Sequence, residues 1–206
     1  MTNPIYEVKS KAKRQVESGN AEGAVRTLET FLEGEPDNSD VRMLLARVLI
    51  YDLKRMDEGI AQLNVILDLE PDDTDAMKAA VTVLMRDKKN NKRTISLFER
   101  LMSVDEDAEV FNLYAKFLRV QKTDFKTSAE YYEKAISLDP KNPDYHQNYA
   151  VLLLNDLRDY VKAKSELEIL MGLDPDNTSA KKNYDLLLKK KFDKDGNPKK
   201  KGLFRR

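Results

Sequence analysis

The stretch FKTSAEYYEKAISLDP, from Phe125 to Pro140, has the clearest helical pattern in the chain. Apolar and small residues recur in it every three or four positions, at Phe125, Ser128, Tyr132, Ala135 and Leu138. This spacing predicts one face of an α-helix, and the dipeptide Asp139-Pro140 predicts where the helix ends.

The same pattern returns along the chain at a regular interval. Its endings are Pro36, Pro71, Pro140 and Pro175, and Glu106 stands where a further proline would fall. The intervals from 36 to 71, 106, 140 and 175 are 35, 35, 34 and 35 residues. That period is the length of one helix–turn–helix unit, so the sequence predicts a repeat array.

The composition agrees with solvated helices. Charged residues make up 35% of the 206 residues, and no sustained alternation of apolar and polar residues predicts a sheet. The chain has no Cys, which excludes a disulfide framework, a thiolate metal site and a cysteine nucleophile. The first residues lack the apolar core of a secretory signal, and no run approaches the roughly 18 apolar residues of a membrane span. We therefore expect a soluble, cytoplasmic protein.

The formal net charge is zero, but the charge is unevenly distributed. Residues 181–206 hold eleven Lys and Arg against three Asp, which leaves 25 bases and 33 acids in the rest of the chain. An acidic body with a basic tail is the feature of the composition that bears on partners.

Each predicted unit has one small residue in its second helix and another small or apolar residue in its first. The second-helix positions are Ala24, Gly59, Thr94, Ser128 and Ala163. The first-helix positions are Ala12, Ala46, Val81, Ala115 and Ala150. The two positions lie 12 residues apart in the first unit and 13 apart in the other four, which predicts a longer turn between helices in those four.

This pattern is similar to that of the tetratricopeptide repeat family. The fourth unit matches it best, with Phe111, Tyr114, Ala115, Leu118, Phe125, Ser128, Tyr132, Ala135 and Pro140. The chain departs from the family in having no Trp, no proline in the third unit, and Lys11 and Gln15 where apolar residues belong. The resemblance implies an all-α, right-handed α-solenoid of antiparallel helix pairs whose first helices line the concave side.

The repeat spacing and the resemblance predict the organisation of the solenoid, and the lack of helical periodicity after residue 191, with Gly196, Pro198 and Gly202, predicts a tail. We expect a solenoid over residues 1–191 and a disordered basic tail over residues 192–206. Within the solenoid, we expect repeats at about 4–37, 38–72, 73–107, 108–141 and 142–176, and a capping helix at 177–191. Such a helix covers the open end of an array.

We found no constellation that predicts an enzyme, a cofactor, a metal or a small-molecule substrate. The single histidine, His146, lies where the family places a large aromatic residue, so we expect a structural role. No phosphate-binding loop occurs. Residues 193–197 resemble the start of a calcium loop, but Pro198 and Phe204 stand at its sixth and twelfth places. Acidic pairs such as Asp72-Asp73 are explained by helix capping.

A family of this kind typically binds extended peptides or helices in its concave groove, so the groove is the predicted site. Its predicted side chains are Lys9, Lys13, Arg47, Tyr51, Lys78, Arg86, Asn112, Lys116 and Arg119. Their mostly basic character predicts an acidic peptide or helical segment of a partner protein. The simpler interpretation is that these helix faces are merely charged and solvated. The family's carboxylate clamp for chaperone tails is not matched.

The basic tail is the second predicted site. It comprises Lys199, Lys200, Lys201, Leu203, Phe204, Arg205 and Arg206. These residues would suit an acidic protein, an anionic membrane surface or nucleic acid, or would simply aid solubility. Our alternative to a protein–protein scaffold is therefore an RNA- or ribosome-associated factor that uses the basic groove and tail.

Overall fold

The computed structural model describes residues 3–104 and 106–199. Apart from one isolated bridge between Phe192 and Pro198, the secondary structure in these ranges is helical. The chain divides into two compact units, Met1–Asp105 and Glu106–Arg206. The all-α architecture expected from the sequence is confirmed.

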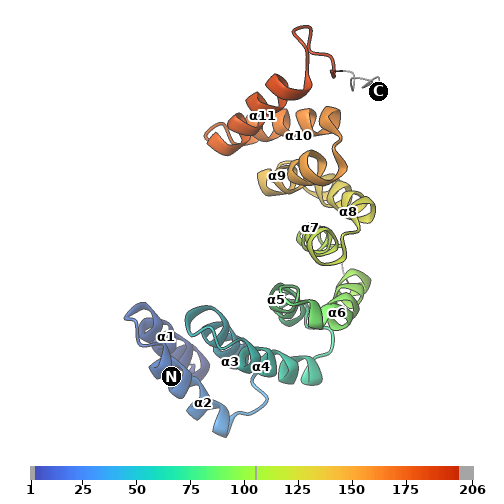
Figure 1. Cartoon of the computed structure of the whole chain (residues 1–206). Coiled ribbons are helices and arrows are strands. Elements are labelled where there is room, and N and C mark those ends of the chain that lie inside the picture. The colour runs from blue at the N-terminus through green and yellow to red at the C-terminus, as the bar shows by residue number, and fades with distance from the viewer. Residues whose placement is uncertain (1–2, 105, 200–206) are drawn as a thin grey trace. The chain divides into compact units, whose positions relative to one another are not determined.

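In the first unit, consecutive helices pack in antiparallel pairs (Figure 1). The pairs are α1 (Pro4–Glu17) with α2 (Ala21–Gly34), α3 (Ser39–Arg47) with α4 (Met56–Leu69), and α5 (Thr74–Leu84) with α6 (Asn91–Val104). Figure 1 shows α1, α3 and α5 on one side of the unit and α2, α4 and α6 on the other. We call the first set the inner helices and the second set the outer helices.

The second unit repeats this arrangement and ends with a single helix. The pairs are α7 (Ala108–Phe117) with α8 (Phe125–Leu138) and α9 (Pro143–Leu152) with α10 (Tyr160–Leu173), followed by α11 (Thr178–Lys191). Helices α7, α9 and α11 are the inner helices of this unit, and α8 and α10 are the outer ones (Figure 1). Helix α11 packs on α10 and buries Ala180 and Leu187, so it covers the apolar face of α10.

Every inner helix begins at an Asn or Asp side chain that accepts a hydrogen bond from a backbone N–H of the first turn. These N-caps are Asn3, Asn38, Asp73, Asp107, Asn142 and Asn177. Each cap satisfies a donor that a helix leaves unpaired at its start. The acidic residues at the junctions therefore include cap residues, as the sequence indicated.

The small residues of the outer helices lie at the closest crossings with the inner helices. Ala24, Thr94, Ser128 and Ala163 are fully buried, and the hydroxyl of Ser128 donates to the carbonyl oxygen of Ala115 at 2.8 Å. A larger side chain at such a crossing would push the two helix axes apart.

In three of the four repeats with the extra residue between the small positions, that residue is accommodated at the end of the inner helix. Three inner helices end in a wider π-helical turn, at Val48–Asp52, Leu118–Lys122 and Leu153–Leu157. The third pair has a short 3₁₀ turn instead, at Lys88–Asn90. After each π-turn comes one residue with positive φ, namely Lys54, Thr123 or Arg158. We expected a longer loop, but most of the added length lies within the helix itself.

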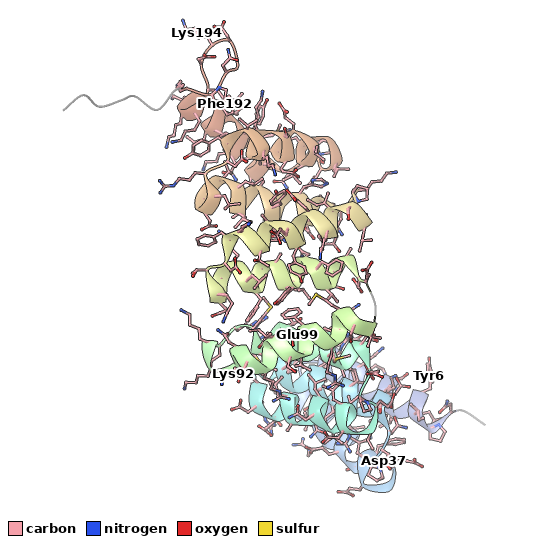
Figure 2. All side chains as sticks on the ribbon, turned by 90° about the vertical axis from the view of Figure 1, so that its right-hand side faces the viewer. Tyr6, Asp37, Lys92, Glu99, Phe192 and Lys194 are labelled. Atoms are coloured by element: carbon pink, nitrogen blue, oxygen red, sulfur yellow. The ribbon has the colours of Figure 1, made fainter. Side chains whose placement is uncertain are left out.

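Residues 192–199 differ from the disordered tail expected from residue 192. Phe192 is 5% exposed and belongs to the core of the second unit. The backbone N–H of Lys199 donates to the carbonyl of Lys191 at 2.8 Å, which closes a turn. Within this turn the Asp193 carboxylate accepts from the N–H groups of Asp195 and Asn197. Figure 2 shows Phe192 at the base of the turn and Lys194 at its tip. The expectation for residues 200–206 lies outside the described residues.

Candidate functional site

In the first unit, most of the predicted groove residues are exposed on the inner helices or on the turns that follow them. Lys13, Arg47 and Arg86 are exposed and make no ion pair within residues 3–104. Tyr51 lies within the π-turn that ends α3 and is 44% exposed. Lys78 is half-buried, and the ammonium of Lys9 lies 3.2 Å from Asp40. The unit therefore offers several accessible basic side chains, but Lys9 is already partly neutralised.

In the second unit, two of the three predicted groove residues have structural partners. The Arg119 guanidinium lies 2.5 Å from the Asp156 carboxylate, and both side chains are about a quarter exposed or less. Asn112 is 9% exposed and accepts a hydrogen bond from Asn148 at 3.1 Å. Lys116 is exposed and has no ion pair in the part of this unit that the structure describes. Lys116 is therefore the accessible basic member of the predicted set here.

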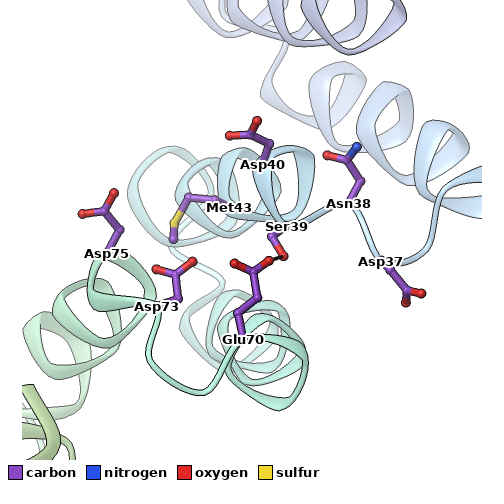
Figure 3. A pocket seen from close by; sticks show the side chains of 8 residues that line it. All are labelled: Asp37, Asn38, Ser39, Asp40, Met43, Glu70, Asp73 and Asp75. Atoms are coloured by element: carbon purple, nitrogen blue, oxygen red, sulfur yellow. Dashed lines mark hydrogen bonds between the residues drawn. The ribbon is translucent and has the colours of Figure 1, made fainter. Parts of the chain in front are cut away.

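An acidic pocket interrupts the basic character predicted for the first unit. It has a volume of about 450 Å³ and lies between the N-terminal ends of α3 and α5 and the turn after α4 (Figure 3). Its carboxylates are Asp37, Asp40, Glu70, Asp73 and Asp75. Ser39 donates to Glu70 at 2.5 Å, and Asp73 accepts from the Ala76 N–H at 2.8 Å. Acidic residues thus mark the amino ends of these inner helices.

Sequence reasoning missed this pocket although a signal was present. Asp75 lies one turn before Lys78, a predicted groove residue, and Asp40 lies one turn before Met43. Helix capping and the helix dipole explain acids at the amino end of a helix, so the sequence alone does not group these carboxylates into a site. The fold shows that Asp40, Met43 and Asp75 line one pocket.

A second pocket, smaller and of opposite character, lies in the second unit. We call it the C-terminal pocket, and its volume is about 190 Å³. Its apolar lining comes from Leu154, Tyr160, Leu186 and Leu187. Its polar lining consists of Asn155, Asn183, Lys190 and Lys191. The end of α9, the start of α10 and one face of α11 therefore meet around it.

The charge of the C-terminal pocket is positive. The Lys191 ammonium lies 4.6 Å from the centre of the Tyr160 ring, a cation–π contact that holds it beside the pocket. Neither Lys190 nor Lys191 makes an ion pair within residues 106–199. The acid on the same π-turn, Asp156, is occupied by Arg119. No residue of this pocket was among the predicted site residues, because α11 was treated only as a cap.

Several ionisable side chains of the second unit join neighbouring helices and have structural roles. Tyr149 donates to Glu133 at 2.5 Å, and Lys162 donates to the same carboxylate at 3.1 Å. The Tyr149 hydroxyl and the Lys162 ammonium lower the pKa of Glu133. Burial and the hydrogen bond to Glu133 raise the pKa of Tyr149. Tyr184 donates to Glu168 at 2.7 Å, so the same kind of contact recurs between the next two helices, α11 and α10.

His146 is packed in the core of the second unit, as its position in the repeat suggested. It is 2% exposed, and its Nδ1 lies 2.7 Å from a carboxylate oxygen of Glu166. Its Nε2 lies 3.0 Å from the carbonyl oxygen of Pro140. Among residues 3–104 and 106–199, no group of three His, Asp or Glu side chains is placed to hold a metal ion. In the same ranges, no helix combines the length and apolar character that crossing a membrane requires.

Comparisons with known proteins agree with the helix-pair geometry. Family models described as tetratricopeptide repeat match residues 15–84, 108–142 and 131–165. No curated protein sequence matches the chain closely enough to show a relationship.

Several solved structures share the fold at low sequence identity. MamA 41-end from Desulfovibrio magneticus RS-1 is 20% identical, has a TM-score of 0.72, and is matched over 86% of this chain and 99% of its own. YrrB, described as a TPR protein with an unusual peptide-binding site, is 18% identical with a TM-score of 0.61, over 79% of this chain and 82% of its own. A thermophilic TPR protein of Thermus thermophilus is 14% identical with a TM-score of 0.64, over 89% of this chain and 98% of its own. At these identities the likeness shows the fold.

Proposed function

Because the chain belongs to the tetratricopeptide repeat family, we propose that it is a protein-interaction scaffold that binds an acidic peptide or helical segment of a partner. The observation that carries this proposal is a set of exposed cations at or just beyond the carboxyl ends of inner helices, namely Arg47 and Arg86 in the first unit and Lys116 in the second. None of them makes an ion pair with another described residue. Charged side chains without partners favour an oppositely charged ligand.

The position of these cations along their helices indicates where the segment lies. Arg47 is at the carboxyl end of α3, and Arg86 follows the end of α5. The acidic pocket is at the amino ends of the same two helices. An acidic segment would therefore lie near the carboxyl ends, where it gains charge-assisted hydrogen bonds and avoids the carboxylates. That YrrB is described as having a peptide-binding site supports a peptide as the ligand of this fold.

We test this proposal with the full chain as an affinity bait and mass spectrometry of the captured proteins. The triple charge reversal Arg47→Glu, Arg86→Glu and Lys116→Glu should lower the yield of the specific partner about tenfold or more. The matched control reverses Arg26, Lys92 and Lys126, which are exposed on the outer helices α2, α6 and α8, and should retain the partner. If the triple reversal leaves capture unchanged while removal of residues 200–206 abolishes it, the tail is the site and the groove proposal fails.

The alternative function, an RNA- or ribosome-associated factor, is favoured by the charge at the end of the second unit. Residues 181–199 contain seven Lys and three Asp. Binding through phosphates would weaken steeply between about 50 and 200 mM salt. Nucleic acid that copurifies with the chain and is released over this range would favour the alternative over the protein scaffold.

A further inference from the structure

We propose that the C-terminal pocket binds an acidic segment of a partner protein through one apolar anchor residue. This inference rests on the proposed scaffold function and adds to it a site in the second unit and the chemistry of the ligand. It is carried by three observations: the volume of the pocket, its exposed apolar wall, and its unpaired lysines.

The volume limits the kind of ligand. About 190 Å³ is well above the roughly 30 Å³ of one water molecule. It is below the approximately 300–1,000 Å³ typical of pockets for drug-sized molecules and cofactors. A single large apolar side chain is the ligand group of matching size.

The apolar wall is exposed to solvent in the free protein. Leu186 is 46% exposed although it lies on the pocket-facing side of α11, next to the half-buried Leu154 and Tyr160. Covering Leu186 with an apolar side chain of the ligand would remove both apolar surfaces from water, which favours binding. Anchor residues in small pockets commonly supply much of the energy of peptide binding.

The polar rim of the pocket favours a ligand with acidic residues next to its anchor residue. Lys190 and Lys191 face the site without a carboxylate partner in residues 106–199. Asn155 and Asn183 each offer a donor and an acceptor, which suits the N–H and C=O groups of a peptide backbone. An Asp or Glu beside the anchor residue would pair with Lys190 or Lys191, while the peptide backbone of the ligand forms hydrogen bonds with the side-chain amides of Asn155 and Asn183.

Nucleic acid fits the same pocket less well. A base would stack on an aromatic ring, but the Lys191 ammonium already covers the Tyr160 ring. The phosphates would pair with the lysines but would leave the leucine side chains of the pocket exposed to water.

The chain's own tail is also opposed, by its charge. Lys199, the last residue that the structure describes, is held beside Lys191 of the pocket by a backbone hydrogen bond. Leu203 and Phe204 are flanked by Lys201, Arg205 and Arg206, and these cations would meet Lys190 and Lys191. The tail is therefore an outcome to be tested rather than the expected occupant.

The test is a selection of displayed peptides of about twelve residues on the full chain, followed by affinity measurements on synthetic copies. We expect the selected peptides to carry Leu, Ile or Phe next to Asp or Glu. Leu186→Glu and Lys190→Glu should each weaken binding about tenfold or more. The matched control is Lys194→Glu at the tip of the turn (Figure 2), which makes the same charge change outside the pocket and should have no effect. Thermal unfolding of each variant verifies the fold.

Other results would overturn the inference. Selected peptides without acidic residues, or binding that Leu186→Glu leaves intact, would exclude an apolar anchor in this pocket. Loss of binding on removing residues 200–206 would place the binding site on the tail, and stronger binding would indicate that the tail itself occupies the pocket. Competition by single-stranded RNA, or by vesicles of phosphatidylcholine and phosphatidylserine at about four to one, with an effect of Lys190→Glu but none of Leu186→Glu, would indicate a phosphate ligand instead.

The outcomes also separate this inference from the scaffold proposal. Peptides that depend on Arg47, Arg86 or Lys116 but not on Leu186 would leave the scaffold proposal standing and refute the C-terminal pocket. Peptides that depend on Leu186 and Lys190 while the triple reversal is harmless would support the pocket and refute the wider groove. A selection that enriches no peptide would refute the pocket, while the affinity capture still decides the scaffold proposal.

Discussion

At Gly59 the crossing of α3 and α4 leaves no room for a side chain. A Cβ atom there would lie 2.3 Å from Cγ1 of Ile50 and 3.1 Å from the carbonyl oxygen of Ala46. Ile50 is 1% exposed, so it cannot easily move away. The other repeats hold Ala, Thr or Ser at the equivalent position, whereas here Ile50, on the π-turn of this pair, fills the space that a Cβ would need.

We expect Gly59→Ala to lower the free energy of unfolding by about 1–3 kcal/mol, because the overpacking exceeds the gain of about 1 kcal/mol in helix propensity. The control is Gly172→Ala in α10, where a Cβ meets nothing within 4 Å. That change should raise stability by up to about 1 kcal/mol. Urea unfolding measures both. If Gly59→Ala stabilised the protein as much as Gly172→Ala, the side chain of Ile50 would have to move aside to make room for the added Cβ, and the overpacking argument would be wrong.

Single residues also show which contacts can be predicted from the sequence and which cannot. The small residue at position 59 was predicted, because repeat spacing and helix packing require it. The ion pair of Arg119 with Asp156 was not predicted, because it joins π-turns 37 residues apart and depends on how two neighbouring helix pairs of the second unit stack. Arg119 was therefore assigned to the open groove, whereas the structure gives it a partner.

At the scale of the element, the turn after α11 extends the folded array beyond its last helix. Phe192 packs against the core of the second unit, and the Lys164 ammonium lies 5.5 Å from its ring centre. The sequence suggested disorder here because the segment lacks helical periodicity and contains Gly196 and Pro198. Those residues instead suit a tight turn, in which Gly196 has a φ of 80°.

We expect Phe192→Ala to cost about 3 kcal/mol of stability, since it empties a buried aromatic site. Amide hydrogen exchange of Lys199, which donates to Lys191, should become faster. Lys194→Ala, at the exposed tip of the same turn (Figure 2), should change stability by less than about 0.5 kcal/mol. A Phe192→Ala protein as stable as the parent would mean that the turn contributes nothing to the fold.

At the scale of the whole molecule, buried tyrosines couple stability to alkaline pH. Burial raises the pKa of Tyr132 to about 12, while its value in the unfolded chain is about 10. The folded state thus keeps a proton that the unfolded state releases. This contribution is fully present below pH 10 and is lost as the pH rises toward 12.

Between pH 9 and pH 11, Tyr132 alone should cost the chain about 1 kcal/mol of stability. Tyr132→Phe should therefore lose less stability over this range than the parent, as measured by urea unfolding at both values. Tyr6→Phe, at a tyrosine that is 68% exposed, is the control and should follow the parent. Parallel losses in the parent and in Tyr132→Phe would contradict the burial argument.

The periodic part of the sequence predicted the architecture, and the non-periodic part did not predict the site. Repeat spacing identified the helix pairs, because burial of one face imposes the same residues in every unit. The acidic pocket and the C-terminal pocket arise where side chains of different helices meet, as Asp40 with Glu70 and Leu154 with Leu186 do. Contacts between side chains that are far apart in the sequence cannot be predicted from the spacing of residues along the chain.

The π-turns of α3, α7 and α9 have a consequence for how the chain can change in length. An inserted residue normally rotates all later residues of a helix by about 100° and turns its apolar face away from the core. Each π-turn accommodates the added residue within one widened turn. At these three turns a residue can therefore be inserted or deleted while the helix before the turn and the helix after it keep the same apolar faces toward the core.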